Sequence, residues 1–149
     1  GDRFAAVDAI LADHASPPGE SNIQAQQAEI DRLFAADDME TIIETLQADG
    51  SELAAASLKA FDHMSPTSLK MTARQITENP DISVRDSLIL EYRLVSQVLL
   101  RHEFYEGIRA ALIDKDRNPQ WKPATLAEVT TGYIDEHFAS LHEQELVLD

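Results

Sequence analysis

Apolar residues recur at helical spacing along almost the whole 149-residue chain, and this pattern constrains the fold more than any other feature. Phe4, Val7, Ile10 and Leu11 form the first such stripe. Spacings of three and four residues place side chains on one face of an α-helix, whereas a half-buried strand needs strict alternation. No alternating run of useful length is present. The sequence therefore predicts an all-α fold, organised as one domain over residues 1–149.

Cap residues, glycines and prolines mark where the helices begin and end. A break at residues 16–21, which holds Pro17, Pro18 and Gly19, follows the first stripe. Aspartate and serine are favoured before the first helical turn, and proline is tolerated inside it. On this basis we expect helices to begin after Asp37 or Asp38, after Ser51 and at Ser65-Pro66, with Gly50 ending the first of them and Thr77 the last.

The longest predicted helix runs from Ser83 to about His102 and carries two apolar stripes. One stripe comprises Val84, Leu88, Tyr92, Val95 and Leu99, and the other comprises Leu90, Leu94 and Val98. A helix with one solvated face needs a single stripe. The double pattern predicts burial from two sides, by other helices or by a missing domain. A shorter helix at residues 105–113, a polar loop at residues 114–123 and a last helix around Ile134 and Phe138 complete the chain.

Composition excludes several classes of function. The chain has no cysteine, so disulfides and cysteine nucleophiles are impossible. Its net charge is −15, which disfavours nucleic acid and anionic membranes as partners. No apolar run reaches the roughly 18 residues that a membrane helix needs. These features favour an intracellular setting, which we expect to be the bacterial cytoplasm.

The chain shows no self-contained catalytic motif. Its five histidines lack the i, i+3 or i, i+4 spacing of a metal site and are expected to occupy solvated helix positions. Neither GxSxG nor a glycine-rich phosphate loop occurs. The pair Glu103 and Glu106 is interpreted as part of a charged face near a helix junction. Lys70 and Arg74 share a helix face and are expected to be solvated or ion-paired. We therefore expect neither a metal nor a catalytic residue in this chain.

The basic residues of the loop at residues 114–123 are more informative. Lys115, Arg117 and Lys122 lie close to Trp121 in this loop. Cationic side chains beside an indole can hold a phosphate and stack on a flat ring. Asp114 and Asp116 weaken the positive field, and a loop that is merely anchored by a buried Trp121 is the alternative interpretation.

Several runs of sequence resemble the C-terminal region of the 3-hydroxyisobutyryl-CoA hydrolases, a family of the enoyl-CoA hydratase/isomerase (crotonase) superfamily. The most specific of them follows the pattern EGxRAxLIDKDxxPxWxP. The matching runs are METIIETLQADGS (Met39–Ser51), SPTSLKMTARQ (Ser65–Gln75), EYRL (Glu91–Leu94) and FYEGIRAALIDKDRNPQWKPATLAEVT (Phe104–Thr130). An ordinary enoyl-CoA hydratase or isomerase shows a looser form of the longest motif and stays the alternative, as does a stand-alone helical interaction module.

The resemblance implies a helical region that lacks the ββα catalytic core of its parent enzyme. Such a parent cleaves 3-hydroxyisobutyryl-CoA to 3-hydroxyisobutyrate and CoA in valine catabolism. It needs no cofactor beyond the coenzyme A of its substrate, and in a eukaryote it would lie in the mitochondrial matrix. No catalytic residue of the family maps onto this chain, so the isolated chain is expected to be inactive.

The resemblance also suggests what the chain contacts. In crotonases the loop after the EG helix lies near the CoA phosphates, which makes Lys115 the best-matched contact, with Arg117, Trp121 and Lys122 as weaker ones. The catalytic core of the same protein and the acyl-CoA substrate are then the expected partners. Helices that normally cover a core expose apolar surface when they are separated from it. We therefore also expect a homo-oligomer, held together through the helix at residues 83–102.

Overall fold

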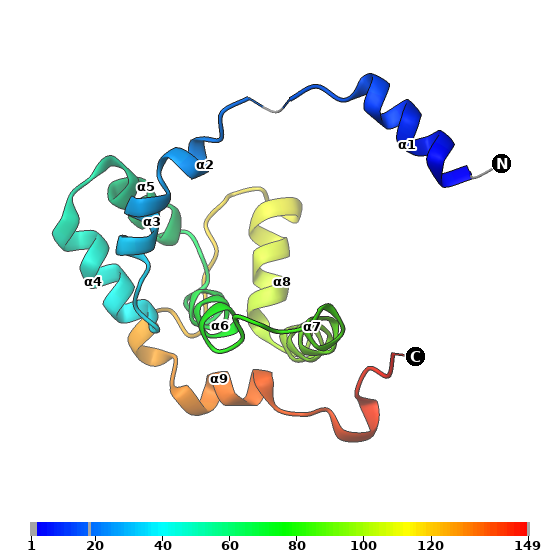
Figure 1. Ribbon diagram of the computed structural model, residues 1–149. Coiled ribbons are helices and arrows are strands. Elements are labelled where there is room, and N and C mark those ends of the chain that lie inside the picture. Colours follow the sequence, from blue (N-terminus) through cyan, green and yellow to red (C-terminus); the bar gives the residue numbers. More distant parts are fainter. Residues whose placement is uncertain (1–2, 18, 149) are drawn as a thin grey trace. The chain divides into compact units, whose positions relative to one another are not determined.

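The computed structural model describes residues 3–17 and 19–148, and every element assigned in them is a helix (Figure 1). This confirms the all-α prediction. Two compact units are present, Gly1–Phe34 and Ala35–Asp149. The single-domain organisation stays a prediction. None of the helices in the described ranges combines the length and apolar character required to cross a membrane.

The first unit contains α1 (Arg3–His14), α2 (Asn22–Ala25) and α3 (Gln27–Leu33). The predicted break separates α1 from α2, although Pro18 within it lies outside the described residues. Ser21 caps α2 by accepting a hydrogen bond from the Gln24 N–H at 3.2 Å. The hydroxyl acceptor satisfies one of the N–H groups that the first turn of a helix leaves unpaired.

The second unit begins with a helical hairpin formed by α4 (Met39–Asp49) and α5 (Glu52–Phe61). Asp38 caps α4 through a 2.8 Å hydrogen bond from the Thr41 N–H, which decides between the two aspartates proposed from sequence. Gly50 follows α4 with φ of 70°, a backbone conformation that a residue without Cβ adopts without strain. Ser51 then caps α5. The short connection keeps the two helices in contact.

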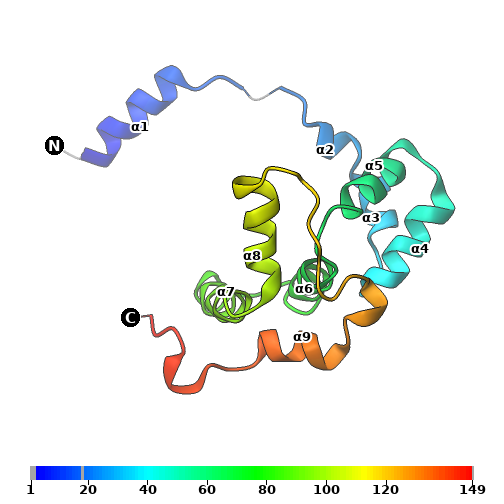
Figure 2. The ribbon, with the colours of Figure 1, turned by 180° about the vertical axis from the view of Figure 1, so that it is seen from behind.

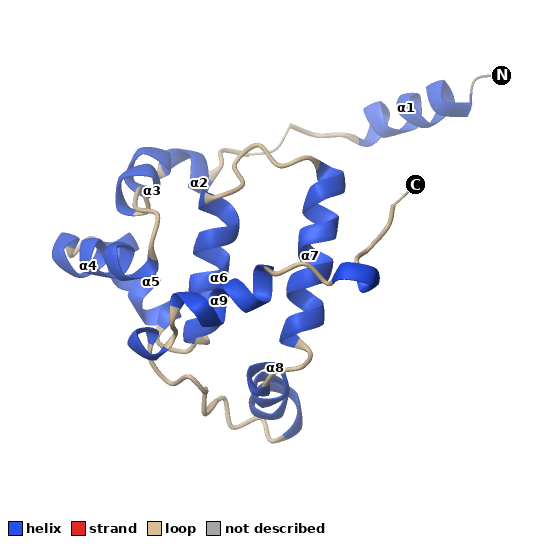
Figure 3. Ribbon diagram, turned by 90° about the horizontal axis from the view of Figure 1, so that it is seen from below, coloured by secondary structure: helices blue, strands red, loops and turns tan. Residues whose placement is uncertain are grey.

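Three helices enclose the main core of the second unit: α6 (Pro66–Thr77), α7 (Val84–Val98) and α9 (Thr131–Phe138). Figure 3 shows α9 lying across α6 and α7. The buried core side chains are Met71, Leu90, Leu94, Val129 and Ile134, and the partly buried Val98, Tyr133 and Phe138 pack against them. The core therefore draws on residues up to 63 positions apart in the sequence, from Met71 to Ile134.

Helix α7 buries only one of its two apolar stripes. Leu90 and Leu94 are in the core, whereas the stripe of Val84, Leu88, Tyr92, Val95 and Leu99 remains 40–80% exposed. Other helices of this chain therefore cover one stripe, and cover of the second stripe by a missing domain stays a prediction. The helix also ends earlier than predicted, at Val98 rather than His102, because the chain turns at residues 99–101 before the next helix.

Helix α8 (His102–Ile108) starts three residues before the predicted Tyr105 and continues into a π-helical turn at Arg109–Ile113. The following segment runs back beside α6 to α9, as Figure 2 shows, and includes a short 3₁₀ turn at Leu126–Glu128. A second 3₁₀ turn, at His142–Gln144, follows α9. Lys70 on α6 pairs with Glu40 and donates to the Val129 carbonyl at 3.0 Å. Arg74 pairs with Glu78 and Asp135. The ion-pair interpretation of these two residues is therefore confirmed.

Ser65 joins α6 to α8. Its hydroxyl accepts the Ser68 N–H at 3.2 Å as the cap of α6 and donates to Glu103 Oε1 at 2.5 Å. Both Ser65 and Glu103 are buried. One side chain thus satisfies the first turn of α6 and a buried carboxylate from a helix 38 residues further along the chain.

We expect Ser65→Ala to lower the free energy of unfolding by about 2–4 kcal/mol, because it removes the α6 cap and leaves the buried carboxylate without its donor. Ser51→Ala is the matched control. It removes a cap alone, so its cost should be about 1 kcal/mol. Urea unfolding followed by circular dichroism measures both values, and equal losses would contradict the linking role of Ser65.

Candidate functional site

The candidate site is the loop that leaves the π-helical turn at Ile113 and returns toward α9. It contains the four residues proposed from sequence, which are Lys115, Arg117, Trp121 and Lys122. Three residues at its base come from α8 and the turn that follows: Glu106, Gly107 and Arg109.

Arg109 binds the first half of this loop to α8. Its Nε and Nη2 atoms donate to the two carboxylate oxygens of Glu106 at 2.9 and 2.7 Å. Its Nη1 donates to Asp114 and to Asp116, each at 2.7 Å, and Nη2 also reaches the Asn118 carbonyl at 3.2 Å. A planar guanidinium with five N–H donors suits such a divided set of acceptors. Arg109 is therefore the centre of an ion-pair network that fixes residues 114–118 against α8.

Glu106 is buried and accepts a further hydrogen bond, at 2.7 Å, from the backbone N–H of Gln120. The hydrogen bonds from Arg109, and after them that from the Gln120 N–H, lower the pKa of Glu106 to about 2. The hydrogen bonds that Arg109 donates to Glu106, Asp116 and Asp114 raise the pKa of Arg109, and Arg109 in turn lowers the pKa of Asp116. Glu106 and Arg109 are thus a permanently charged pair at neutral pH.

Lys115, Arg117 and Lys122 are exposed, and within residues 3–17 and 19–148 their side chains form no ion pair. Lys115 and Arg117 have φ angles of 58° and 53°, in the left-handed region. The Arg117 N–H donates to the Ala110 carbonyl at 3.1 Å, and the Asn118 N–H donates to Asp116 at 2.9 Å. The backbone of the loop is thus tied down while its cationic side chains project into solvent.

Trp121 packs on Gly107 of the EG pair. A Cβ placed on Gly107 would meet the indole Cη2 at 3.4 Å, so glycine allows the ring to approach the helix closely. Trp121 lines a hollow of about 610 Å³ together with Arg117, Pro119 and His63. Of the four predicted residues, Arg117 and Trp121 therefore meet at one hollow, whereas Lys115 and Lys122 do not line it. Trp121 thus anchors the loop while the cationic side chains of the loop stay exposed. Anchoring by Trp121 and phosphate binding by the cations, the two interpretations made from sequence, are therefore compatible.

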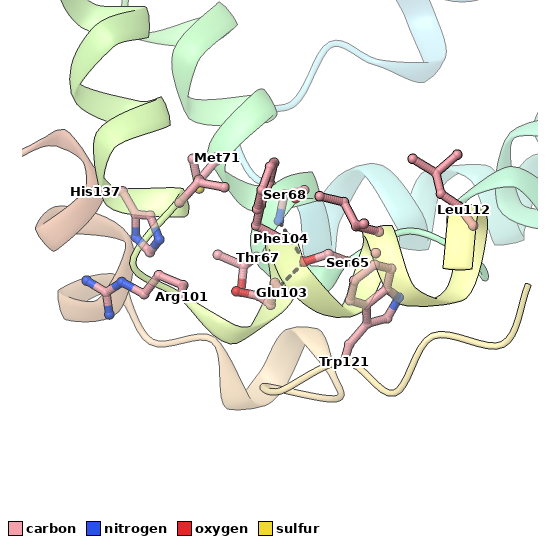
Figure 4. A pocket seen from close by; sticks show the side chains of 14 residues that line it. Ser65, Thr67, Ser68, Met71, Arg101, Glu103, Phe104, Leu112, Trp121 and His137 are labelled. Atoms are coloured by element: carbon pink, nitrogen blue, oxygen red, sulfur yellow. Dashed lines mark hydrogen bonds between the residues drawn. The ribbon is translucent and has the colours of Figure 1, made fainter. Parts of the chain in front are cut away.

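A second hollow, of about 420 Å³, is lined by residues of α6, α8 and α9 and also by Trp121 (Figure 4). Ser65, Thr67, Glu103 and His137 are its buried polar residues. Burial lowers the pKa of His137 and so favours its neutral form, and its Nδ1 lies 2.8 Å from the Tyr133 carbonyl. Among the described residues, three buried side-chain atoms find no hydrogen-bond partner, and all three belong to residues that line this hollow: Thr67 Oγ1, Trp121 Nε1 and His137 Nε2.

Two interpretations made from sequence are wrong here. Glu103 and Glu106 are buried and hydrogen-bonded, not part of a solvated charged face. His137 is also buried, although a solvated position was expected for it. Arg109 was not singled out at all. The i, i+3 spacing of Glu106 and Arg109, followed by two aspartates, is the signal that would have identified the network.

The low pKa of Glu106 predicts a pH-dependent contribution to stability. A carboxyl whose pKa falls on folding stabilises the folded state above its ordinary pKa of 4.5, and this contribution is lost as the pH falls toward 2. We therefore expect Glu106→Gln to unfold at lower urea concentration than the wild type at pH 7, with a gap that narrows below about pH 4.5.

Glu143→Gln, at an exposed position outside the network, is the control and should show no such gap at pH 7. Urea midpoints measured between pH 7 and pH 3 test this prediction. A gap that stays constant over the whole range would contradict the assigned pair.

The chain is similar to known proteins along most of its length. The family model described as enoyl-CoA hydratase/isomerase matches residues 2–138. Curated relatives include the mitochondrial 3-hydroxyisobutyryl-CoA hydrolases of Danio rerio and Homo sapiens. Each is 48% identical to this chain, over 126 and 117 residues respectively, which is 85% and 78% of the chain but 33% and 30% of the relative. The chain therefore spans about a third of the length of these relatives.

Solved structures give the same assignment. An enoyl-CoA hydratase from Rhodobacter sphaeroides 2.4.1 matches 99% of this chain and 44% of its own, with a TM-score of 0.84 and 36% identity. A carnitinyl-CoA dehydratase from Mycobacterium thermoresistibile matches 95% of this chain and 40% of its own, with a TM-score of 0.85 and 35% identity. The family resemblance seen in the sequence is thus confirmed, and the chain belongs to the enoyl-CoA hydratase/isomerase family.

Proposed function

We propose that this chain is the helical C-terminal region of an acyl-CoA thioester hydrolase that converts 3-hydroxyisobutyryl-CoA to 3-hydroxyisobutyrate and CoA in valine catabolism. The observation that carries the proposal is the 48% identity, over most of the chain, to relatives named 3-hydroxyisobutyryl-CoA hydrolase. The equivalent region of an enoyl-CoA hydratase or isomerase is the second candidate. The similarity to the Rhodobacter enoyl-CoA hydratase favours it, at the lower identity of 36%.

Within that enzyme the role of this region is to bind and cover, not to catalyse. Ser65 and Glu103 have the residue types of a nucleophile and its base, but both are buried, and Ser65 also caps α6 by accepting the Ser68 N–H. The catalytic residues belong to the core of the same protein, in the two-thirds of the relatives that this chain does not match. No cofactor is required, because coenzyme A enters as part of the substrate.

The loop supplies the contact with coenzyme A. Lys115 and Arg117 are exposed cations on a backbone held by Arg109, and Arg117 and Trp121 share the 610 Å³ hollow. An exposed ammonium or guanidinium group suits a phosphate, and an indole suits a flat ring. Lys115 is the principal phosphate ligand in this proposal, with Arg117, Trp121 and Lys122 in supporting roles.

The exposed stripe of α7 is the second contact surface. Five apolar side chains on one helix face, from Val84 to Leu99, form the kind of patch that marks a protein–protein contact. In the complete enzyme the catalytic core or a second subunit would cover it, and in the isolated chain a second copy would do so. The bacterial cytoplasm is the proposed location, or the mitochondrial matrix if the source is a eukaryote.

A single titration tests the proposal. The isolated chain, mixed with 3-hydroxyisobutyryl-CoA, should bind it in isothermal titration calorimetry and release no free thiol above buffer. We expect Lys115→Ala to weaken binding about threefold to tenfold, since it removes one charge-assisted contact at an exposed site.

Arg85→Ala, which removes an exposed cation in the first turn of α7 and is not among the residues that line the 610 Å³ hollow, should leave the affinity unchanged. Thiol release by the isolated chain would overturn the non-catalytic role. Equal affinities of the wild type and Lys115→Ala would remove Lys115 from the binding site.

A further inference from the structure

The acidic and basic residues alternate in the loop, and this alternation poses a problem for anion binding. Asp114 and Asp116 flank Lys115, and Asp116 precedes Arg117. Neighbouring carboxylates would ordinarily pair with these cations or repel a phosphate. In the structure both aspartates instead accept hydrogen bonds from Arg109 at 2.7 Å. Arg109 thus binds both aspartates and leaves Lys115 and Arg117 free to bind an anion.

We propose that Arg109 is the positioning residue of the loop: by binding Glu106, Asp114, Asp116 and the Asn118 carbonyl together, it holds Lys115 and Arg117 where they meet phosphate. The phosphate ligand in this inference rests on the proposed function, whereas the conformation of the loop rests on the hydrogen bonds of Arg109. Arg109 itself is engaged by protein acceptors, so it acts through Lys115 and Arg117 rather than by touching the ligand.

The backbone supports this role. Lys115 and Arg117 both adopt a left-handed conformation, which is unfavourable for a residue with a Cβ and persists only where surrounding contacts impose it. The contacts that impose this conformation lie on either side of Lys115 and Arg117. Arg109 binds the side chains of Asp114 and Asp116, and the N–H groups of Asn118 and Gln120 are bound by Asp116 and Glu106, which are themselves partners of Arg109.

The network also explains why a lysine would not replace Arg109. Without the guanidinium, the carboxylates of Glu106, Asp114 and Asp116 would converge without a common donor and repel one another. Lysine would restore the charge at a single point, but it cannot donate to both oxygens of Glu106 and to the loop acids at once. Arg109→Lys therefore separates the geometry of the network from its charge.

The test compares wild type with Arg109→Lys, alone and in a Lys115→Ala/Arg117→Ala background, using the 149-residue chain and CoA as the probe. We expect Arg109→Lys alone to weaken CoA binding about fivefold in calorimetry. In the Lys115→Ala/Arg117→Ala background, the same substitution should weaken CoA binding by less than about twofold. Such non-additivity is the signature of a residue that acts through others. Arg74→Lys, which alters an arginine bound to Glu78 and Asp135 outside the loop, is the matched control and should leave CoA affinity unchanged.

Hydrogen exchange gives a readout that does not depend on CoA. The Asn118 and Gln120 amides should exchange at least about tenfold faster in Arg109→Lys than in the wild type, and at the wild-type rate in Arg74→Lys. If the wild type binds no CoA, the proposed function fails. In that case faster exchange in Arg109→Lys still supports the role of Arg109 in holding the loop, whereas unchanged exchange overturns that role. If the wild type binds CoA, unchanged affinity in Arg109→Lys overturns the positioning role, as does an equal loss in both backgrounds.

Discussion

The packing of Leu90 and Leu94 of α7 against α6 and α9 is the interaction on which the second unit depends. These two leucines meet Met71 from one helix and Val129 and Ile134 from a segment far along the chain. Burial of a leucine side chain contributes about 1.5–3 kcal/mol. Because α6, α7 and α9 converge there, the start of α6 at Ser65 and the start of α8 at His102 are brought together, and the buried Ser65–Glu103 hydrogen bond becomes possible.

The candidate loop depends on a different force. Its shape comes from charge and hydrogen bonding around Arg109, with Trp121 packed on Gly107 as the apolar contribution. Such a network is directional, so it can fix a loop of alternating charges in one conformation where apolar burial could not. The network also separates the charges in space. The loop carboxylates bind Arg109, whereas Lys115 and Arg117 stay exposed to an anionic ligand.

The sequence predicted the local features well because their causes are local. The caps at Asp38, Ser51, Ser65 and Ser83 lie within three residues of the N–H groups they bind, so each helix start could be read directly. The end of α7 was missed because no glycine or proline marks it. Burial of Glu103 and of Glu106 could not be predicted, since their partners, Ser65 and the Gln120 N–H, lie 38 and 14 residues away. The double stripe of α7 was recognised, but the sequence alone did not reveal which stripe this chain covers.

The uncovered stripe of α7 follows directly if the chain is a helical cover that requires a protein surface against it. Light scattering of the isolated chain over a range of concentrations tests this claim. We predict that the mass rises from one chain toward two, and that Leu88→Lys/Val95→Lys keeps it at one, while Ile76→Lys, at an exposed apolar position on α6, leaves the association unchanged. A wild-type chain that stays monomeric at every concentration would contradict the covering role.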